Sequence, residues 1–364
     1  MRAFLILIPI GIFFLMHLGV AWRLCAVLEQ AFRWKPLLLW FAAMVLNVVL
    51  VMAVTMRGGW NPLVRAWRVV TETYLGLLFI LLSILLCWAI VQGAAILFRK
   101  PVPGPVSRWV VFGAFAIYTI AALANAMTVR LKTVELTSPK LDAPLTLVQM
   151  SDLHLGPVHG AAYVDRLVKL ANAAQPDLVL VTGDLLERGV RPDDLRGFHG
   201  LDAPAYLVWG NHDKFFHRRQ ALELLAATPL ILLEDEVVLA DGRVQLAGLD
   251  YPGFEGERKQ GEALEKLSLG DGRFTVLLSH SPMDFALWDQ TPVDLQLAGH
   301  THAGQIVPFN LVVRLRYRLL HGLYRRGDKA TYVSPGTGTW GPPLRLGTRN
   351  EVTCIRILPE GREP

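Results

Sequence analysis

Four long apolar stretches within the first 130 residues constrain this 364-residue chain more than any other feature. They cover residues 3–22, 36–56, 73–98 and 109–129, and none of them contains Asp, Glu, Lys or Arg. A helix needs about 20 apolar residues to cross the hydrocarbon core of a bilayer, and each stretch is about that long. The sequence therefore predicts an N-terminal bundle of four transmembrane helices within residues 1–132.

The first stretch has a second interpretation as a cleaved signal peptide, because Arg2 precedes it and Gly19-Val20-Ala21 resembles a cleavage site. Its length and the three stretches that follow favour an uncleaved helix. A transporter or channel is disfavoured, because transport pathways need several partnered charges inside the membrane. Here the stretches offer only His17, and Asn47 as a lone polar residue of the second. We interpret the bundle as a membrane anchor.

Charge is distributed unevenly along the chain. Residues 1–140 contain 13 Lys and Arg against 3 Asp and Glu, whereas residues 141–364 contain 23 against 28. The basic residues belong to the loops between the apolar stretches, where they suit anionic lipid headgroups. No nucleic-acid-binding motif is visible, so the expected partner is the lipid bilayer and not a nucleic acid. We expect a multi-pass protein of the plasma (bacterial inner) membrane. The nearly equal basic content of successive loops leaves open which side of the membrane the C-terminal part faces.

Residues 133–364 have the pattern of a separate α/β domain. Short apolar runs typical of buried strands occur at residues 145–150, 177–183, 205–210, 274–279 and 293–299. Apolar residues on one helical face over 164–171 predict a helix between the first two runs, and a second helix is predicted over 217–227. Residues 236–249 predict a hairpin that turns at Asp241-Gly242.

Side chains able to bind a metal follow each of these five runs. In chain order they are Asp152 and His154, Asp184, Asn211 and His212, His280, and finally His300 and His302. Each motif alone is common, but ligands in open α/β sheets gather at the carboxyl ends of strands, so the five loops are expected to converge on one site. Oxygen and imidazole ligands without a thiolate suit Mn, Fe, Zn or similar divalent ions. The other histidines, at positions 17, 159, 199, 217 and 321, are interpreted as structural or solvated.

The order of these motifs resembles the calcineurin-like metallophosphoesterase superfamily over about residues 145–305. The motifs are Asp152-x-His154, Gly183-Asp184, Gly210-Asn211-His212-Asp213, His280 and Gly299-His300-Thr301-His302. The later segments PFN and GTGTWGPP, at 308–310 and 336–343, are similar to the membrane-associated, YkuE-like branch. The resemblance implies a four-layer αββα sandwich for residues 133–364. Ala303 and Pro335 depart from the usual pattern without removing a ligand.

The resemblance also implies the roles of the site residues. Two divalent metal ions are expected, the first held by Asp152, His154 and His302. The second is expected at Asn211, His280 and His300, with Asp184 bridging the pair. His212 would lie near the leaving-group oxygen as a proton or hydrogen-bond donor, and Asp213 would either orient it or be structural.

Together these features predict a membrane-anchored, dinuclear metal-dependent phosphoesterase. It would hydrolyse a phosphodiester or pyrophosphate bond through attack by a metal-bridging hydroxide. The membrane anchor suggests a lipid-linked or membrane-proximal substrate, such as a phospholipid or a lipid-linked pyrophosphate. The alternatives are a phosphomonoesterase or protein phosphatase with the same site, and an inactive membrane sensor or scaffold, although no ligand is lost.

Two segments outside the site carry further expectations. The segment SPGTGTWGPP, residues 334–343, lacks the Lys-Ser/Thr pair of a nucleotide-binding loop and is interpreted as a turn-rich loop near the site in which Trp340 packs. Residues 311–326 predict an interfacial helix with Arg314, Arg318 and Arg325 on one face and leucines on another. A partly buried helix with solvated arginines is the alternative.

Overall fold

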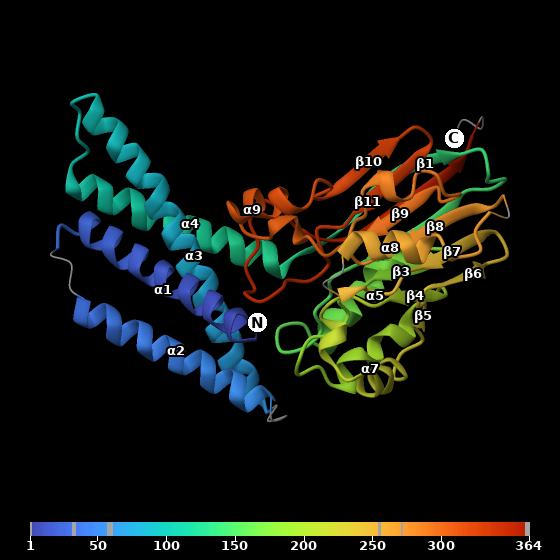
Figure 1. The fold of residues 1–364 in the computed structure, drawn as a ribbon, viewed down its shortest axis with the longest axis horizontal. Coiled ribbons are helices and arrows are strands. Elements are labelled where there is room, and N and C mark those ends of the chain that lie inside the picture. Colours follow the sequence, from blue (N-terminus) through green and yellow to red (C-terminus); the bar gives the residue numbers. More distant parts are fainter. Residues whose placement is uncertain (1, 31–33, 57–60, 254–255, 271, 361–364) are drawn as a thin grey trace. The chain divides into compact units, whose positions relative to one another are not determined.

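The computed structural model describes residues 2–30, 34–56, 61–253, 256–270 and 272–360 (Figure 1). The chain divides into two compact units. The first consists of Met1–Ala124 with Gly341–Leu344, and the second of Asn125–Trp340 with Arg345–Pro364.

The described residues of the N-terminal part form four helices. They are α1 (Arg2–Val27), α2 (Trp34–Met56), α3 (Pro62–Leu97) and α4 (Gly104–Met127). Each helix contains one predicted apolar stretch or nearly all of it. Helix α3 begins well before residue 73, because the Asn61 side chain caps it by accepting from Val64 N at 3.0 Å, and because Pro62 suits the first turn of a helix. Among the described residues, α3 and α4 are long and apolar enough to cross a membrane; the apolar parts of the others are shorter, at Phe14–Val27 and Trp34–Leu50.

The second unit is built around two six-stranded sheets. The first has the order β1-β12-β2-β3-β4-β5 and the second β10-β11-β9-β8-β7-β6. The strands of the first sheet are β1 (Val129–Ser138), β2 (Leu145–Met150), β3 (Leu178–Thr182), β4 (Ala205–Val208), β5 (Ile231–Leu232) and β12 (Asn350–Pro359). Those of the second are β6 (Glu236–Ala240), β7 (Val244–Gly248), β8 (Phe274–Leu278), β9 (Leu295–Ala298), β10 (Gly322–Arg326) and β11 (Lys329–Val333).

All five predicted strands are confirmed, as β2, β3, β4, β8 and β9. Strands β2, β3 and β4 run parallel, as do β7, β8 and β9, so within each sheet their carboxyl ends lie at one edge. The predicted hairpin is β6 paired antiparallel with β7. Its turn residues Asp241 and Gly242 have φ of 50° and 64°, as a tight hairpin turn requires.

Side chains of the sheets alternate between two cores, and β3 shows this most clearly. Leu178 and Leu180 pack between the two sheets, whereas Val179 and Val181 pack under helices on the outer face. A strand buried on both faces reads as a continuous apolar run, which is why "LVLVT" is apolar up to its last residue, Thr182. The sheets therefore share one core, and each has a second core on its other side.

Helices cover both outer faces (Figure 1). Helices α5 (Ala161–Ala173) and α7 (Arg218–Leu225) pack on the first sheet, with the short α6 (Pro192–Leu195) beside α5. Helix α8 (Gly256–Leu264) and the turn Phe285–Leu287 contribute to the core on the second sheet. The order helix, sheet, sheet, helix is the four-layer arrangement that the family resemblance implies.

The predicted helix over residues 311–326 is wrong beyond Arg316. Helix α9 covers Phe309–Arg316, and β10 then begins at Gly322 and pairs antiparallel with β11. Gly322 has φ of 92°, which a helix does not accommodate. No residue of α9 is buried, and Leu315 is 88% exposed.

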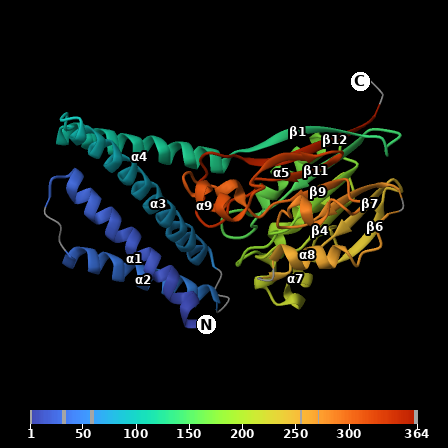
Figure 2. The same ribbon diagram turned by 45° about the horizontal axis from the view of Figure 1, so that its top comes forward.

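Strand β12 lies between β1 and β2, parallel to β1 and antiparallel to β2 (Figure 2). β1 begins two residues after α4 ends, so the predicted domain boundary between residues 132 and 133 falls inside this strand. The sequence patterns predicted neither β1 nor β12.

Candidate metal centre

The loops that follow β2, β3, β4, β8 and β9 bring the predicted ligands together. His154 N donates to the Asp184 carbonyl at 3.0 Å, which joins the loop after β2 to the loop after β3. His280, after β8, has Nδ1 2.9 Å from the carbonyl of Thr182 at the end of β3, which joins the second sheet to the first. Strands from both sheets thus end at one site.

The backbone at this site is strained. Asp152, His154, Asp184, His300 and His302 all have left-handed φ, between 47° and 69°. Non-glycine residues seldom adopt this conformation, because the Cβ crowds the following carbonyl. Such residues persist only where the surrounding structure imposes them, and they concentrate at functional sites.

Two glycines allow the loops to approach the acidic side chains. A Cβ at Gly210 would overlap the Asp184 carboxylate, and a Cβ at Gly299 would overlap Asp152 and Ser151. Any larger residue would have to displace a candidate ligand, so both Gly-Asn-His and Gly-His-x-His need their glycine.

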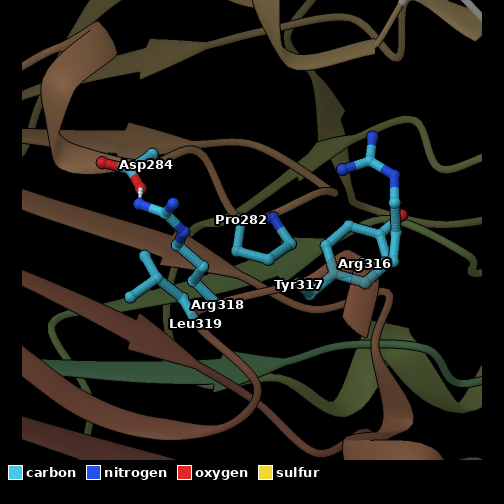
Figure 3. Close-up of a pocket in the computed structure, with 6 residues that line it drawn as sticks. All are labelled: Pro282, Asp284, Arg316, Tyr317, Arg318 and Leu319. Carbon is cyan, nitrogen blue, oxygen red and sulfur yellow. Dashed lines mark ion pairs between the residues drawn. The ribbon is translucent and has the colours of Figure 1, made fainter. Parts of the chain in front are cut away.

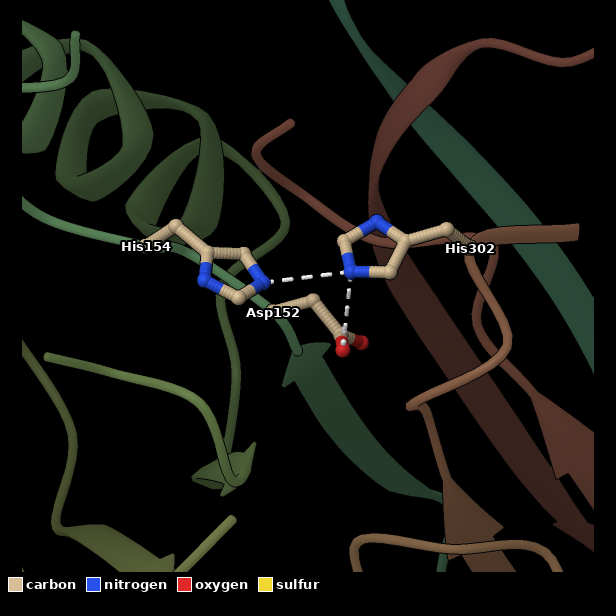
Figure 4. Close-up of side chains that lie close together, drawn as sticks. All are labelled: Asp152, His154 and His302. Carbon is tan, nitrogen blue, oxygen red and sulfur yellow. Dashed lines mark hydrogen bonds and ion pairs between the residues drawn. The ribbon is translucent and has the colours of Figure 1, made fainter. Parts of the chain in front are cut away.

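The first cluster consists of Asp152, His154 and His302 (Figure 4). His154 Nε2 lies 3.1 Å from His302 Nε2, which in turn lies 3.4 Å from Asp152 Oδ1. All three side chains are buried. Two imidazole nitrogens and a carboxylate oxygen that face one point form a set of ligands for a divalent ion.

The second cluster consists of Asp184, His280 and His300, with Asn211 beside them. His280 Nε2 lies 2.9 Å from Asn211 Oδ1 and 3.0 Å from His300 Nδ1. Because the Thr182 carbonyl can only accept, Nδ1 of His280 carries the proton of that bond, and Nε2 is left to face the other ligands. The cluster therefore presents two imidazoles, a carboxylate and an amide oxygen.

Asp184 connects the two clusters. Its Oδ2 lies 3.3 Å from His280 Nε2 in the second cluster and 3.7 Å from His154 Nε2 in the first. Its Oδ1 accepts from His212 N at 2.8 Å, which fixes the orientation of the carboxylate. One oxygen that faces both clusters is the arrangement expected of a bridging ligand.

The electrostatics of the site favour bound cations. Burial lowers the pKa of His300 to about 3 and that of His302 well below its usual range, so both are neutral imidazoles, the form that binds metals. Burial also lowers the pKa of His280, but the carboxylates of Asp184 and Asp152 outweigh it and raise that pKa to about 9. The acidic groups thus attract positive charge into a buried site, and the clustered Asp and His side chains are able to hold two divalent ions.

His212 lies beside the clusters, and Glu187 orients it. Glu187 Oε2 lies 2.8 Å from His212 Nδ1 and 3.6 Å from His154 Nδ1. Burial lowers the pKa of His212, but the hydrogen bond to Glu187 and the negative charges of Asp184 and Glu187 together outweigh this and raise the pKa above its usual value. Glu187 was not predicted from the sequence; its position three residues after Asp184 in "GDLLE" was the available signal.

Of the two roles expected for Asp213, orienting His212 or supporting the fold, the structure shows the second. It is buried rather than exposed, and its carboxylate accepts from Gly210 N at 2.8 Å and Leu186 N at 2.7 Å. It therefore holds the loop after β4 against the loop after β3, and its role is structural.

Two further side chains contact the candidate ligands from behind. Tyr317 OH lies 2.8 Å from His300 Nε2. Arg345 is fully buried and donates to the carbonyls of Pro335 and Gly338 at 2.7 and 2.8 Å, with Nη2 3.4 Å from His302 Nδ1. Residues that hold the far nitrogen of a metal-binding histidine fix its ring, so both act as positioning residues.

The loop at 334–343 lies near the site, as predicted. Gly338 N donates to the carbonyl of Asp152 at 3.0 Å. Trp340 differs from the prediction, because its side chain does not pack in the core: it is 49% exposed, with its ring 6.1 Å from that of His212. His159, predicted as structural, is buried with Nε2 3.0 Å from Thr339 Oγ1 and supports this loop.

Comparison with known proteins agrees with this geometry. The family model described as Calcineurin-like phosphoesterase matches residues 145–304, which include every candidate ligand. A metallophosphoesterase of Campylobacter jejuni is 33% identical over 260 residues, 68% of each chain. A transmembrane protein with metallophosphoesterase domain of Danio rerio is 32% identical over 66% of this chain and 60% of its own. The metallophosphoesterase YkuE of Bacillus subtilis is 30% identical over 58% of this chain and 78% of its own.

The chain spans about two thirds of the length of the Campylobacter relative and of a metallophosphoesterase of Helicobacter pylori, at 68% and 65%. This level of identity, together with the family match across both metal-capable clusters, shows that the chain belongs to the calcineurin-like metallophosphoesterases and is a metal-dependent phosphoester hydrolase.

Proposed function

We propose that the chain is a membrane-anchored phosphoesterase that uses two divalent ions to hydrolyse a phosphodiester or pyrophosphate bond of a lipid-linked or membrane-proximal substrate. The observation that carries this proposal is the position of Asp184, whose Oδ2 faces His154 in one cluster and His280 in the other. A shared carboxylate between two buried ligand sets suits in-line displacement at phosphorus.

The two clusters support the ligand assignment. Asp152, His154 and His302 would hold the first ion, and Asn211, His280 and His300 would hold the second, with Asp184 shared. When bound, the ions supply Lewis-acid activation of the phosphoryl group and of the attacking water. The chain's own contribution is to fix the ligands through the strained loops and to exclude bulk water by burial.

His212 is the group placed to act on the leaving oxygen. Its Nδ1 is held by Glu187, which leaves Nε2 as the ring nitrogen available to a substrate. Glu187 raises the pKa of His212, so the ring carries a proton at neutral pH more readily than an isolated histidine. The ring donates that proton, or a hydrogen bond, to the oxygen that departs.

The membrane part of the proposal rests on composition and on the surface of α9. We assign residues 1–132 as an anchor in which α1–α4 cross the plasma membrane, and residues 133–364 as the catalytic domain. The Danio rerio relative is named as a transmembrane protein, which supports the anchor. Exposed apolar side chains on α9, at Phe309, Leu311, Val312 and Leu315, give the catalytic domain an apolar surface that suits a bilayer.

The test uses the full chain in detergent micelles with Mn²⁺, assayed on bis(p-nitrophenyl) phosphate and p-nitrophenyl phosphate. We expect faster turnover of the diester, loss of turnover on chelation, and recovery when Mn²⁺ is restored. A preference for the monoester would replace the proposal with a phosphomonoesterase. No turnover of either ester by protein that binds two ions would contradict the proposal altogether.

A further inference from the structure

Two exposed aromatic side chains lie against the ring of His212. Phe215 is 57% exposed, and its ring centroid lies 5.0 Å from that of His212; the half-exposed ring of Trp340 lies 6.1 Å away. Both meet the imidazole close to edge on, at interplanar angles of 65° and 77°. They come from separate loops, which follow β4 and β11. Large aromatic side chains that converge on one polar ring and stay open to solvent indicate a surface that a ligand covers.

The backbone holds both aromatic residues in place. Gln305 donates from Nε2 to the Trp340 carbonyl at 3.0 Å and accepts from Trp340 N at 2.9 Å, so one side chain engages both backbone polar groups of that residue. Phe215 closes the turn Asp213–Phe215, and its N donates to the His212 carbonyl at 3.0 Å. The two rings are therefore carried by anchored loops, although the rings themselves face solvent.

The charged neighbours of His212 are engaged with other groups. Lys214, next to Phe215 in the same turn, pairs with Asp250 at 2.6 Å. Glu187 lies behind the imidazole, 2.8 Å from Nδ1. Of the described side chains whose rings lie against His212, the exposed ones are both apolar.

The two aromatic rings lie near the place that a leaving group must occupy. The His212 ring is 4.7 Å from that of His154, a candidate ligand of the first ion, and its Nε2 is the nitrogen available to a substrate. A leaving oxygen that takes a proton or a hydrogen bond from Nε2 lies about 2.6 to 3.2 Å from it. A departing alcohol of more than a few atoms therefore has Phe215 and Trp340 within reach.

The pocket of about 200 Å³ shown in Figure 3 is a poorer match for an apolar alcohol. Two of the six side chains that line it are arginines, Arg316 and Arg318. It also lies behind His300, because its Tyr317 OH contacts Nε2 of that ring at 2.8 Å, whereas Nδ1 faces His280 in the second cluster at 3.0 Å. The apolar surface next to the reacting groups is the one at His212.

We propose that Phe215 and Trp340 form a subsite for an apolar departing alcohol. The inference rests on the proposed function and narrows its substrate class to phosphodiesters in which one alcohol is apolar. It also assigns the bond that breaks, because such a diester has two ester bonds and the aromatic rings lie beside the group that acts on the leaving oxygen. Covering exposed aromatic surface with an apolar group removes both from water, which favours this orientation of the substrate.

The step is a hydrolysis in which the apolar alcohol departs. Water adds its hydroxyl to phosphorus, the P–O bond to that alcohol breaks, and the alcohol oxygen takes a proton from Nε2 of His212. The remaining proton of the water returns to His212 through solvent. The second ester group stays on phosphorus, so the products are the apolar alcohol and a phosphomonoester.

2-Naphthyl phenyl phosphate tests the subsite, because its two ester oxygens are similarly basic while one alcohol is larger and more apolar. Hydrolysis gives either 2-naphthol or phenol, and the initial ratio of these products reports which bond breaks. Alkaline hydrolysis of the same diester supplies the ratio set by chemistry alone. The full chain, loaded with Mn²⁺ in detergent micelles, should exceed that ratio in favour of 2-naphthol by about 5-fold or more, since the second fused ring buries additional apolar surface.

Variants assign the preference to the two rings. Trp340→Ala and Phe215→Ala should each lower the ratio of 2-naphthol to phenol by about 2-fold or more, and Trp340→Phe should retain part of the preference because a ring is kept. Leu239→Ala is the control, since Leu239 is a similarly exposed apolar residue on β6, and it should leave the ratio unchanged. The ratio does not depend on the fraction of folded or metal-loaded enzyme, so a variant that folds poorly still reports on the subsite.

Three results would overturn the subsite. The first is a wild-type chain that hydrolyses the diester with metal but gives the alkaline product ratio or favours phenol; the proposed function then stands and the subsite fails. The second is a wild-type ratio that persists in both alanine variants, which would place the naphthyl group elsewhere. The third is an equal loss of preference in Leu239→Ala. If the diester is not hydrolysed in a metal-dependent way, the proposed function itself fails and the subsite with it.

Discussion

Glu187 holds the His212 ring through a 2.8 Å contact between Oε2 and Nδ1. The same oxygen lies 3.6 Å from Nδ1 of His154, a candidate ligand of the first ion. One partly buried carboxylate therefore links the proposed proton donor to the metal cluster, and movement of either ring alters the environment of the other.

His212→Gln should retain two ions per chain and lose about 10²- to 10⁴-fold in kcat, the range for a positioned general acid. The loss should be smaller for a p-nitrophenyl ester, whose leaving group needs no proton, than for an alkyl ester. Steady-state kinetics on both esters and metal analysis check this. Equal losses for the two leaving groups would argue against the acid role.

Glu187→Gln keeps an oxygen that can accept from His212 but removes the charge. We expect about a 10-fold lower kcat on alkyl esters, as for loss of a partner behind a metal-site histidine. In a His212→Gln background the same change should have little further effect, because its target is gone. The kcat values of wild type, the two single variants and the double variant test the coupling. If the two losses in activation free energy add in the double variant, Glu187 acts independently of His212.

Asp184→Asn should empty both metal positions and abolish turnover, because the shared carboxylate charge is lost from both clusters. Asn211→Ala should chiefly empty the second position, since Asn211 contacts only His280 among the candidate ligands whose hydrogen bonds the structure describes. Metal analysis of the two purified variants separates these outcomes. A fully active Asp184→Asn enzyme with two ions would rule out a bridging role.

Arg345→Met should destabilise the catalytic domain by about 2 kcal/mol or more, because the buried carbonyls of Pro335 and Gly338 lose their donor. Arg349→Gln is the control, since Arg349 is exposed on the same stretch of chain. Thermal unfolding of the full chain in detergent, followed by tryptophan fluorescence, measures the difference. An Arg345→Met variant that unfolds at the wild-type temperature would mean that water replaces the guanidinium without loss of unfolding free energy.

Leu315→Gln tests the apolar surface of α9. Leu315 is 88% exposed, so its replacement should leave folding and the hydrolysis of soluble diesters unaffected. Turnover of a phosphodiester lipid in vesicles should fall about 3-fold or more, because burial of a leucine in lipid contributes about 1.5 to 3 kcal/mol. Leu239→Gln, at a 52% exposed leucine of β6, is the matched control. The same loss of vesicle turnover in both variants would show that α9 does not contact the membrane.

The strands that position the site were predictable because each is a short apolar run that ends in a polar residue. At β3 the apolar run "LVLVT" is followed directly by Gly183-Asp184, so the strand pattern and the candidate ligand both occur within seven residues. Strands β1 and β12 were missed because their pairing joins segments about 220 residues apart. The local periodicity of apolar residues carries no information about a partner strand at that distance. The helix predicted through Gly322 failed for a local reason, since leucines spaced for a helix also suit an alternating strand.

The ligands were predictable from their order along the chain, but their supporting residues were not. Glu187, Tyr317 and Arg345 act on the far side of imidazole rings, and they reach them through loops whose spacing follows no motif. The role of Asp213 stayed open because an acid next to a histidine in sequence suggests a pair, whereas the fold turns its carboxylate toward backbone amides.

Strand β12, which lies between β1 and β2, is synthesised after all the other described strands. Among the described strands, β1 pairs only with β12, and 211 residues separate the end of β1 at Ser138 from the start of β12 at Asn350. A ribosome that adds about 5 to 20 residues per second needs roughly 10 to 40 s to cover that length. During this time β1 follows a completed apolar helix with its backbone amides unmatched, an edge that invites pairing with other chains. Translation that stops before residue 350 therefore yields an aggregation-prone fragment rather than a shorter enzyme.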